Sequence, residues 1–98
     1  MTMETIWKYP IEIQDRQTIK MPRGAAILCC QVQKGVPCIW AFVDSAVKEM
    51  SERIIRIFGT GLPITRDRCE GWPWPFRYIG TFQTLNGDFV GHVFEEEK

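Results

Sequence analysis

Apolar and polar residues alternate along much of this chain with a period of two, the pattern of half-buried β-strands. In residues 6–13, one face of the predicted strand carries Trp7, Tyr9, Ile11 and Ile13. Further strands are predicted at residues 17–21, 25–33, 36–43, 53–58, 76–85 and 88–94. Because Pro10 lacks a backbone donor, we expect the first strand to lie at a sheet edge or to contain a bulge.

Turn signals separate these strands. Lys34-Gly35 and Asn86-Gly87 predict two-residue hairpin turns, and Asn-Gly suits the type I′ turn, which needs positive φ at both positions. The strand that returns after Lys34-Gly35, residues 36–43, places Val36, Cys38, Trp40 and Phe42 on a common face. Asp44 and Ser45 either cap one or two helical turns over residues 46–52 or begin an irregular loop.

Seven or so strands with frequent turns predict an all-β fold, a small antiparallel β-sandwich or barrel with at most one short helix. The chain has 98 residues, which suits a single domain spanning residues 1–98. Residues 59–75 contain three prolines and three glycines and therefore predict a long loop. Residues 95–98 are expected to form a disordered, solvated tail.

The charge balance narrows the possible partners. Twelve Lys and Arg residues match twelve Asp and Glu residues, whereas proteins that hold polymeric nucleic acid usually carry a basic excess. Residues 1–20 lack the apolar core of a signal peptide, and residues 36–43 are too short to span a bilayer. We therefore expect no membrane partner and a cytoplasmic location, where four free thiols persist, those of Cys29, Cys30, Cys38 and Cys69.

Catalytic and metal-binding chemistry is sparse. His92 is the single histidine, and Cys29 and Cys30 are adjacent and point to opposite faces of a strand, so no metal site or cofactor is predicted. His92 lies between Val90 and Phe94 in a predicted strand, which favours a structural sheet histidine over the base of a Cys–His pair. We expect a protein that is not an enzyme, with a small-nucleotide phosphodiesterase as a minor alternative.

The long loop is the exception. Gly59-Thr60-Gly61 follows a strand and allows backbone amides to approach an anion, although the Gly-Lys-Ser/Thr ending of a Walker loop is missing. Guanidinium groups bind phosphates and indole rings stack on bases. The candidate ligand-binding residues are therefore Gly59, Thr60, Gly61, Arg56, Arg66, Arg68, Trp72, Trp74 and Arg77. Alternatively, the tryptophans close one end of the core and the arginines are solvated.

Four segments, IWKYPIEIQDRQTIKMPRGAAIL, QVQKGVPCIWAFVD, RIFGTGLPI and RYIGTFQTLNGDFVGHVFE, resemble a family of small proteins encoded by bacteriophages and prophages. The resemblance covers residues 6–95, and the family has a domain of unknown function. Its members typically read Gly-Thr-Gly-His-Pro where this chain has Leu62 before Pro63, so any role of that histidine is absent here. Residues 69–76 look like an expansion of a shorter family loop.

The resemblance implies a phage protein in the cytoplasm of a bacterial host. With the candidate residues above, it suggests a non-catalytic counter-defence protein that sequesters a small nucleotide immune signal, a cyclic nucleotide or an ADP-ribose derivative. The alternative is a protein–protein interaction module, a host-protein inhibitor or a phage component, anchored by Trp72, Trp74 and Phe76. Exposed strand edges and many aromatic residues also predict a homo-oligomer.

Overall fold

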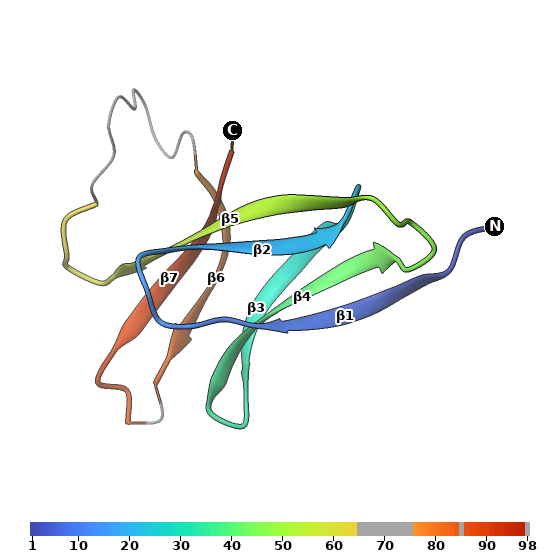
Figure 1. The fold of residues 1–98 in the computed structure, drawn as a ribbon. Coiled ribbons are helices and arrows are strands. Elements are labelled where there is room, and N and C mark those ends of the chain that lie inside the picture. Colours follow the sequence, from blue (N-terminus) through green and yellow to red (C-terminus); the bar gives the residue numbers. More distant parts are fainter. Residues whose placement is uncertain (65–75, 85, 98) are drawn as a thin grey trace.

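The computed structural model describes residues 1–64, 76–84 and 86–97, which form seven strands in two antiparallel sheets (Figure 1). The strands are β1 (Glu4–Pro10), β2 (Arg16–Pro22), β3 (Ala26–Gln33), β4 (Val36–Asp44), β5 (Met50–Gly59), β6 (Phe76–Gln83) and β7 (Val90–Glu96). One sheet has the order β1-β4-β3 and the other the order β2-β5-β7-β6. The predicted all-β fold with seven strands is confirmed, as a sandwich and not as a closed barrel.

The ends of the strands differ from the sequence prediction in several places. Pro10 is the last residue of β1, an edge strand, as its missing donor predicted. The chain leaves the sheet directly afterwards, where the N–H of Ile11 donates to Pro37 O at 2.9 Å. At the other end of the chain, Glu95 and Glu96 belong to β7, although the sequence suggested a solvated tail from residue 95 onward.

The two predicted hairpin turns differ in outcome. Lys34 and Gly35 both have positive φ, 51° and 81°, as a type I′ turn between β3 and β4 requires. In the β6–β7 turn only Gly87 has positive φ among its described residues, so the type I′ prediction is wrong there. The N–H of Thr84 instead donates to Phe89 O at 3.0 Å, and these two residues close a longer loop.

Residues 45–49 form no helix. Instead, they form a single turn that the Asp44 side chain caps. Its Oδ1 accepts a hydrogen bond from the N–H of Ala46 at 3.0 Å, and the N–H of Val47 donates to Asp44 O at 3.0 Å. A second bond, from the N–H of Met3 to Asp44 Oδ1 at 2.8 Å, ties this turn to the start of β1. The irregular alternative is the correct one, and β5 begins at Met50.

The core lies between the two sheets. It is built from alternate residues of the central strands, which point toward one another across the sandwich. Its members from β4, β5, β6 and β7 are all at most 5 % exposed, namely Ile39, Ala41, Val43, Ile55, Ile57, Phe82 and Val93. The opposite face of β4 carries the predicted common set Val36, Cys38, Trp40 and Phe42, and it is the outer face, on which Val36 and Phe42 are exposed.

Strands β3 and β6 approach each other most closely at the corner of the sandwich. A Cβ atom on Gly80 would lie 3.1 Å from Cys30 O and 3.2 Å from Cys30 N, so only glycine allows this separation. The pairing of each strand shifts nearby, between Ile27 and Cys29 in β3 and between Tyr78 and Gly80 in β6. Bulges of this kind bend a strand, which lets the two sheet edges meet.

The four-stranded sheet is also covered on its outer face, the face that points away from the three-stranded sheet. Ile54, Arg56 and Phe58 of β5 point outward, yet each is at most 9 % exposed. The chain leaves β5 beside this face through residues 60–64, the yellow segment of Figure 1. A strand buried on both faces is typical of a sheet centre that is covered on each side, and this arrangement positions the candidate site.

Candidate functional site

Three phenylalanine rings pack together on the outer face of the four-stranded sheet, next to the candidate site. Phe58 of β5, Phe76 of β6 and Phe94 of β7, here called the aromatic cluster, are 5–6 % exposed. The ring centroid of Phe58 lies 5.4 Å from that of Phe76 and 5.7 Å from that of Phe94. These tilted and edge-on arrangements are the ones that the ring quadrupoles favour, so the cluster forms a stable apolar surface outside the main core.

Arg56 packs against this cluster and is neutralised there. Its guanidinium stacks over Phe58 at 5.1 Å, and its Nη1 donates to Glu96 Oε1 at 2.9 Å. Asp15 contributes its backbone oxygen at 3.1 Å from Nε and its carboxylate at 3.6 Å from Nη2. Through these contacts Arg56 joins β5 to β7 and to Asp15, the residue before β2. Its side chain is only 10 % exposed and already paired, so it has little charge to offer a phosphate.

A tight turn begins where β5 ends. The N–H of Leu62 donates to Gly59 O at 3.1 Å, and Gly61, the third residue of this turn, has φ of +81°. Positive φ at the third position is the signature of a type II turn, which explains the glycine. Gly59 leaves room for two side chains, because a Cβ atom there would lie 2.9 Å from Leu62 Cδ1 and 3.0 Å from Phe89 Cε1, and one or both would have to shift.

The turn and the aromatic cluster enclose a hollow of about 300 Å³. Two of the three cluster rings form its floor, and the turn, two aliphatic side chains and one imidazole form its sides. Its lining residues are Phe58, Gly59, Thr60, Gly61, Leu62, Ile64, His92 and Phe94. Leu62 is 62 % exposed, which is unusual for a large aliphatic side chain beside an apolar floor.

Hydrogen-bonding groups line one side of the hollow. Thr60 Oγ1 lies 2.5 Å from His92 Nε2, and Thr81 Oγ1 lies 3.2 Å from His92 Nδ1. The phenol of Tyr78 continues the chain, with its oxygen 2.6 Å from Thr81 Oγ1. We call this Thr60–His92–Thr81–Tyr78 series the hydroxyl chain. Both ring nitrogens of His92 are bonded, as expected for a structural histidine, but the bond to Thr60 lies at the rim of the hollow.

The structure brings some of the predicted ligand residues together and separates others. Gly59, Thr60 and Gly61 all line the hollow, and Arg56 lies on the same face of the sheet beneath it. Arg77 points to the opposite face, because its neighbours Phe76 and Tyr78 both pack on Phe94 at the outer face. The remaining candidates, Arg66, Arg68, Trp72 and Trp74, lie outside the described residues.

The backbone of the turn differs from the predicted anion cradle. The N–H of Thr60 donates to Val90 O at 3.2 Å, and that of Leu62 is used within the turn. The N–H of Gly61 has no partner among the described residues, so it is available to a ligand. An anion nest needs several successive free amides. The turn as described can donate one hydrogen bond to a neutral group, but it does not offer the several amides that would bind a phosphate.

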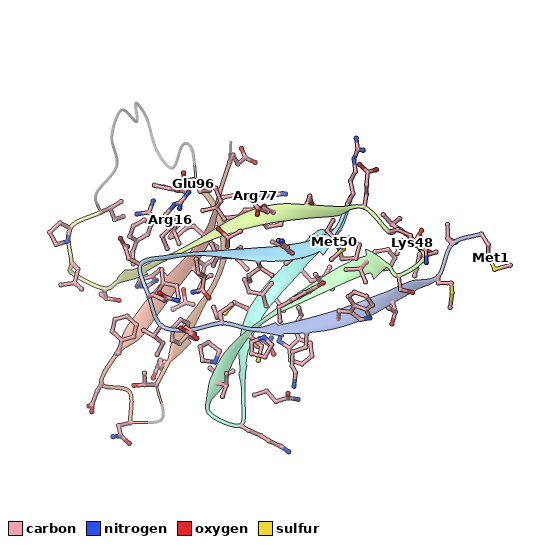
Figure 2. All side chains as sticks on the ribbon, in the orientation of Figure 1. Met1, Arg16, Lys48, Met50, Arg77 and Glu96 are labelled. Atoms are coloured by element: carbon pink, nitrogen blue, oxygen red, sulfur yellow. The ribbon has the colours of Figure 1, made fainter. Side chains whose placement is uncertain are left out.

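Arg77 lines a second hollow, of about 460 Å³, at the end of the four-stranded sheet. In Figure 2, Arg77, Arg16 and Glu96 lie at this end. Arg53, which also lines the hollow, pairs with Glu95 through two bonds of 2.5 and 3.1 Å and donates to Ala25 O at 2.8 Å. The other carboxylates lining it are those of Glu52, Glu96 and Glu97, so its charge does not suit an anion.

Sequence reasoning missed the hydroxyl chain. Thr81 pairs with His92 in the register of β6 and β7, and Thr60 reaches His92 from the end of β5, where Phe58 pairs with His92. Only the pairing of three strands brings these residues together. The one available signal was that each of two strands carries a polar residue two positions from a phenylalanine, Tyr78 after Phe76 in β6 and His92 before Phe94 in β7. Phe76 itself is buried, so it cannot anchor a surface contact as the interaction hypothesis required.

Other kinds of site are not apparent in the described part of the chain. Residues 1–64, 76–84 and 86–97 contain no group of three His, Cys, Asp or Glu side chains placed to hold a metal ion. They also contain no helix that could cross a membrane. Cys30 and Cys38 are buried and Cys29 is half-buried, all three as free thiols.

Comparison with known proteins gives one match. A family model described as a domain of unknown function (DUF7352) matches residues 3–98, nearly the whole chain. No curated protein and no solved structure matches this sequence.

Proposed function

Because the chain belongs to the DUF7352 family of domains of unknown function, its role has to be inferred from its own residues, and we propose that it binds and sequesters a small nucleotide. The base of the nucleotide enters the hollow beside the Gly59–Leu62 turn. The observation that carries this proposal is the hollow itself, which combines a buried aromatic floor, exposed aliphatic sides and a hydrogen-bonding edge. Pockets for small molecules commonly combine apolar and aromatic walls with a few polar groups, and a planar heterocycle can use both.

The contacts of the base follow from the lining. Its faces lie between the rings of Phe58 and Phe94 and the aliphatic side chain of Leu62. Its edge bonds to the Thr60 hydroxyl and to the free N–H of Gly61. At about 300 Å³ the hollow is at the lower limit for small-molecule sites, so it suits one base or nucleoside and not a complete cyclic dinucleotide. The rest of the ligand projects outside it.

We expect binding without turnover. Thr60 and His92 are placed like the hydroxyl and base of a hydrolase, at hydrogen-bond distance. In such enzymes a carboxylate on the second ring nitrogen stabilises the imidazolium that forms. Here the group at His92 Nδ1 is the neutral hydroxyl of Thr81, and no carboxylate of the described residues bonds to His92. The pair therefore lacks the charge that activation of Thr60 would need.

We place this activity in a bacteriophage or prophage, in the cytoplasm of the bacterial host, where the protein would lower the free concentration of a nucleotide immune signal. The resemblance of the sequence to phage-encoded proteins supports this context. Sequestration requires a stoichiometric amount of protein and tight binding, and it needs no catalytic residues. A small chain whose histidine has no carboxylate partner among the described residues fits that requirement.

The test is calorimetric titration with cyclic di- and trinucleotides, cyclic ADP-ribose isomers and the component nucleosides. Leu62→Asp places a charge at the rim of the hollow and should weaken binding at least about tenfold, which is about 1.4 kcal/mol. Thr60→Val removes one hydroxyl and should weaken binding about three- to tenfold. The matched controls, Leu28→Asp and Thr18→Val, change exposed residues elsewhere and should leave the affinity unchanged.

Two results would overturn the proposal. One is the absence of binding heat and of thermal stabilisation with every compound tested. The other is a ligand whose affinity does not change in the Leu62→Asp and Thr60→Val variants. Mass spectrometry of the ligand after release from the protein decides between binding and catalysis, since an unchanged mass is expected and a product would reveal an enzyme.

A further inference from the structure

The two sheets have four edge strands, and they are protected to different degrees. The edges β3 and β6 face each other, where Gly80 meets the backbone of Cys30. The edge β2 carries the exposed charges of Arg16 and Lys20 and ends at Pro22. Charges, prolines and bulges are the usual means by which proteins prevent an edge from pairing with another chain. Strand β1 is the remaining edge.

Like β2, strand β1 carries two exposed charged residues and ends at a proline, but its charges, those of Glu4 and Lys8, have opposite signs. Its seven residues pair with β4 in continuous register, with no bulge, and six of them are exposed. Ile6 on the outer face is 55 % exposed and Trp7 on the opposite face is 39 % exposed. In Figure 1, β1 lies at the border of its sheet beside β4. A straight edge with exposed apolar side chains on both faces is a template for another strand.

The charges of β1 are arranged symmetrically about Ile6. Glu4 precedes Ile6 by two residues and Lys8 follows it by two, so all three side chains lie on the same face. Neither charged residue forms an ion pair within the described ranges. If two copies of this strand pair antiparallel about Ile6, Glu4 of each copy lies opposite Lys8 of the other. The free edge is therefore complementary to itself.

We propose that β1 pairs with β1 of a second copy of this chain, antiparallel and centred on Ile6. The register places Glu4 opposite Lys8 twice, Thr5 opposite Trp7 twice, and Ile6 opposite Ile6. Pro10, which has no N–H to donate, lies beyond the paired residues. The two three-stranded sheets join into one sheet of six strands, and the contact has the twofold symmetry of most homodimers.

The side chain of Lys8 changes partner in this dimer. In the single chain its ammonium group donates across β4 to the side-chain oxygen of Gln33. A carboxylate binds an ammonium more strongly than a neutral amide oxygen does, so Glu4 of the second copy replaces Gln33. The exchange leaves no buried charge unpaired, because both groups lie at the exposed face of the sheet.

The test is sedimentation equilibrium at several protein and salt concentrations. Wild type should show a monomer–dimer equilibrium that salt weakens, because the contact is small and includes two exposed ion pairs. Glu4→Lys and Lys8→Glu each place like charges opposite one another and should weaken the dimer about tenfold. Lys20→Glu, on the edge strand β2, is the matched control and should dimerise like wild type.

Mixing the two variants gives the sharpest result. A Glu4→Lys chain carries two lysines at this edge and a Lys8→Glu chain carries two glutamates, so an equimolar mixture should form a heterodimer although neither variant dimerises well alone. The double variant Glu4→Lys/Lys8→Glu should self-associate like wild type, which excludes a simple folding defect. A wild-type protein that stays monomeric at all concentrations, or a dimer unaffected by both single variants, would overturn the proposal. Neither result depends on nucleotide binding.

Discussion

Nη1 of Arg56 lies 2.9 Å from Oε1 of Glu96, and this ion pair joins β5 to β7 next to the aromatic cluster. The two residues are 40 positions apart in the chain. Their pairing explains how an arginine can be buried in a strand of apolar residues. Arg56 therefore has a structural role, since it is already paired with two carboxylates and is not needed to bind a ligand in the hollow.

Removing the charge of Glu96 should therefore destabilise the fold. Glu96→Gln keeps the size of the side chain but leaves the buried Arg56 with Asp15 as its one carboxylate partner among the described residues. We expect a loss of about 1–3 kcal/mol in the free energy of unfolding, measured by urea denaturation. Glu97→Gln, the exposed neighbour, is the control and should change stability by less than about 0.5 kcal/mol. Equal effects would contradict the structural role of the pair.

The close approach of β3 and β6 predicts a cost for any side chain at Gly80. Gly80→Ala would place Cβ about 0.3 Å too close to the backbone of Cys30, which cannot move without shifting the strand. We expect a destabilisation of about 1–3 kcal/mol in urea denaturation, as for other overpacked sites. Alanine normally stabilises a strand relative to glycine, so an unchanged or raised stability would show that the two strands lie farther apart.

The buried thiol of Cys30 predicts a loss of stability in alkali. Burial, with smaller effects of Cys29 and Cys38, raises the pKa of Cys30 from its ordinary value of 9.0 to about 11. A raised pKa in the folded state means that the stabilisation is complete below pH 9 and is lost as the pH rises toward 11.

Cys30→Ala should remove this part of the pH dependence. The variant should lose less stability than wild type between pH 9 and 11 in urea denaturation, although a small cavity lowers its stability at neutral pH. Cys29→Ala, which changes the half-buried neighbour, should retain the steep alkaline loss. Parallel curves for Cys30→Ala and wild type would contradict the prediction.

Asp44 predicts the opposite dependence, in acid. Hydrogen bonds from the N–H of Met3 and then of Ala46 lower the pKa of this carboxyl below its ordinary 3.8. Its stabilisation is therefore present above pH 3.8 and is lost as the pH falls through the lower folded value. Asp44→Asn keeps an acceptor oxygen but has no charge to titrate, so its melting temperature should fall less than that of wild type on acidification.

Asp88→Asn is the matched control for this measurement. It removes an exposed carboxylate from the β6–β7 loop and should leave the acid dependence of the melting temperature unchanged. If Asp44→Asn and wild type lose stability to the same extent in acid, the two backbone hydrogen bonds do not stabilise the charged carboxyl.

Local patterns predicted most of the fold. Period-two alternation, together with an apolar run at residues 25–33 and the β-branched and aromatic residues of 53–58, located all seven strands. Lys34-Gly35 predicted its turn correctly because the required φ angles are a property of those two residues. The turn at Asn86-Gly87 was mispredicted because bonds between Thr84 and Phe89, outside the dipeptide, determine the loop. Alternation also grouped Val36 with Phe42 correctly, but it could not show that their face is the outer one, since both faces of β4 are apolar.

The candidate site was less accessible to prediction. The Gly59-Thr60-Gly61 motif lies in the turn that lines the hollow, and glycines after a strand indicate a tight turn whatever the rest of the fold. The role of Arg56 depended on Glu96 and Asp15, and the role of His92 depended on Thr60 and Thr81. Each of these contacts is set by strand order and register, which a single sequence does not determine.

The hydroxyl chain connects β6, the edge strand of the four-stranded sheet, to the rim of the hollow. A neutral imidazole donates from one nitrogen and accepts at the other, so the tautomer of His92 determines whether Thr81 donates to it or accepts from it. A ligand bound to the Thr60 hydroxyl as proposed would compete with the Thr60–His92 bond, and the phenol of Tyr78 is linked to that bond through Thr81 and His92. The exposed phenol of Tyr78 thus lies on a strand that contributes no described residue to the lining of the hollow, yet two hydrogen-bonded side chains, Thr81 and His92, connect it to the rim.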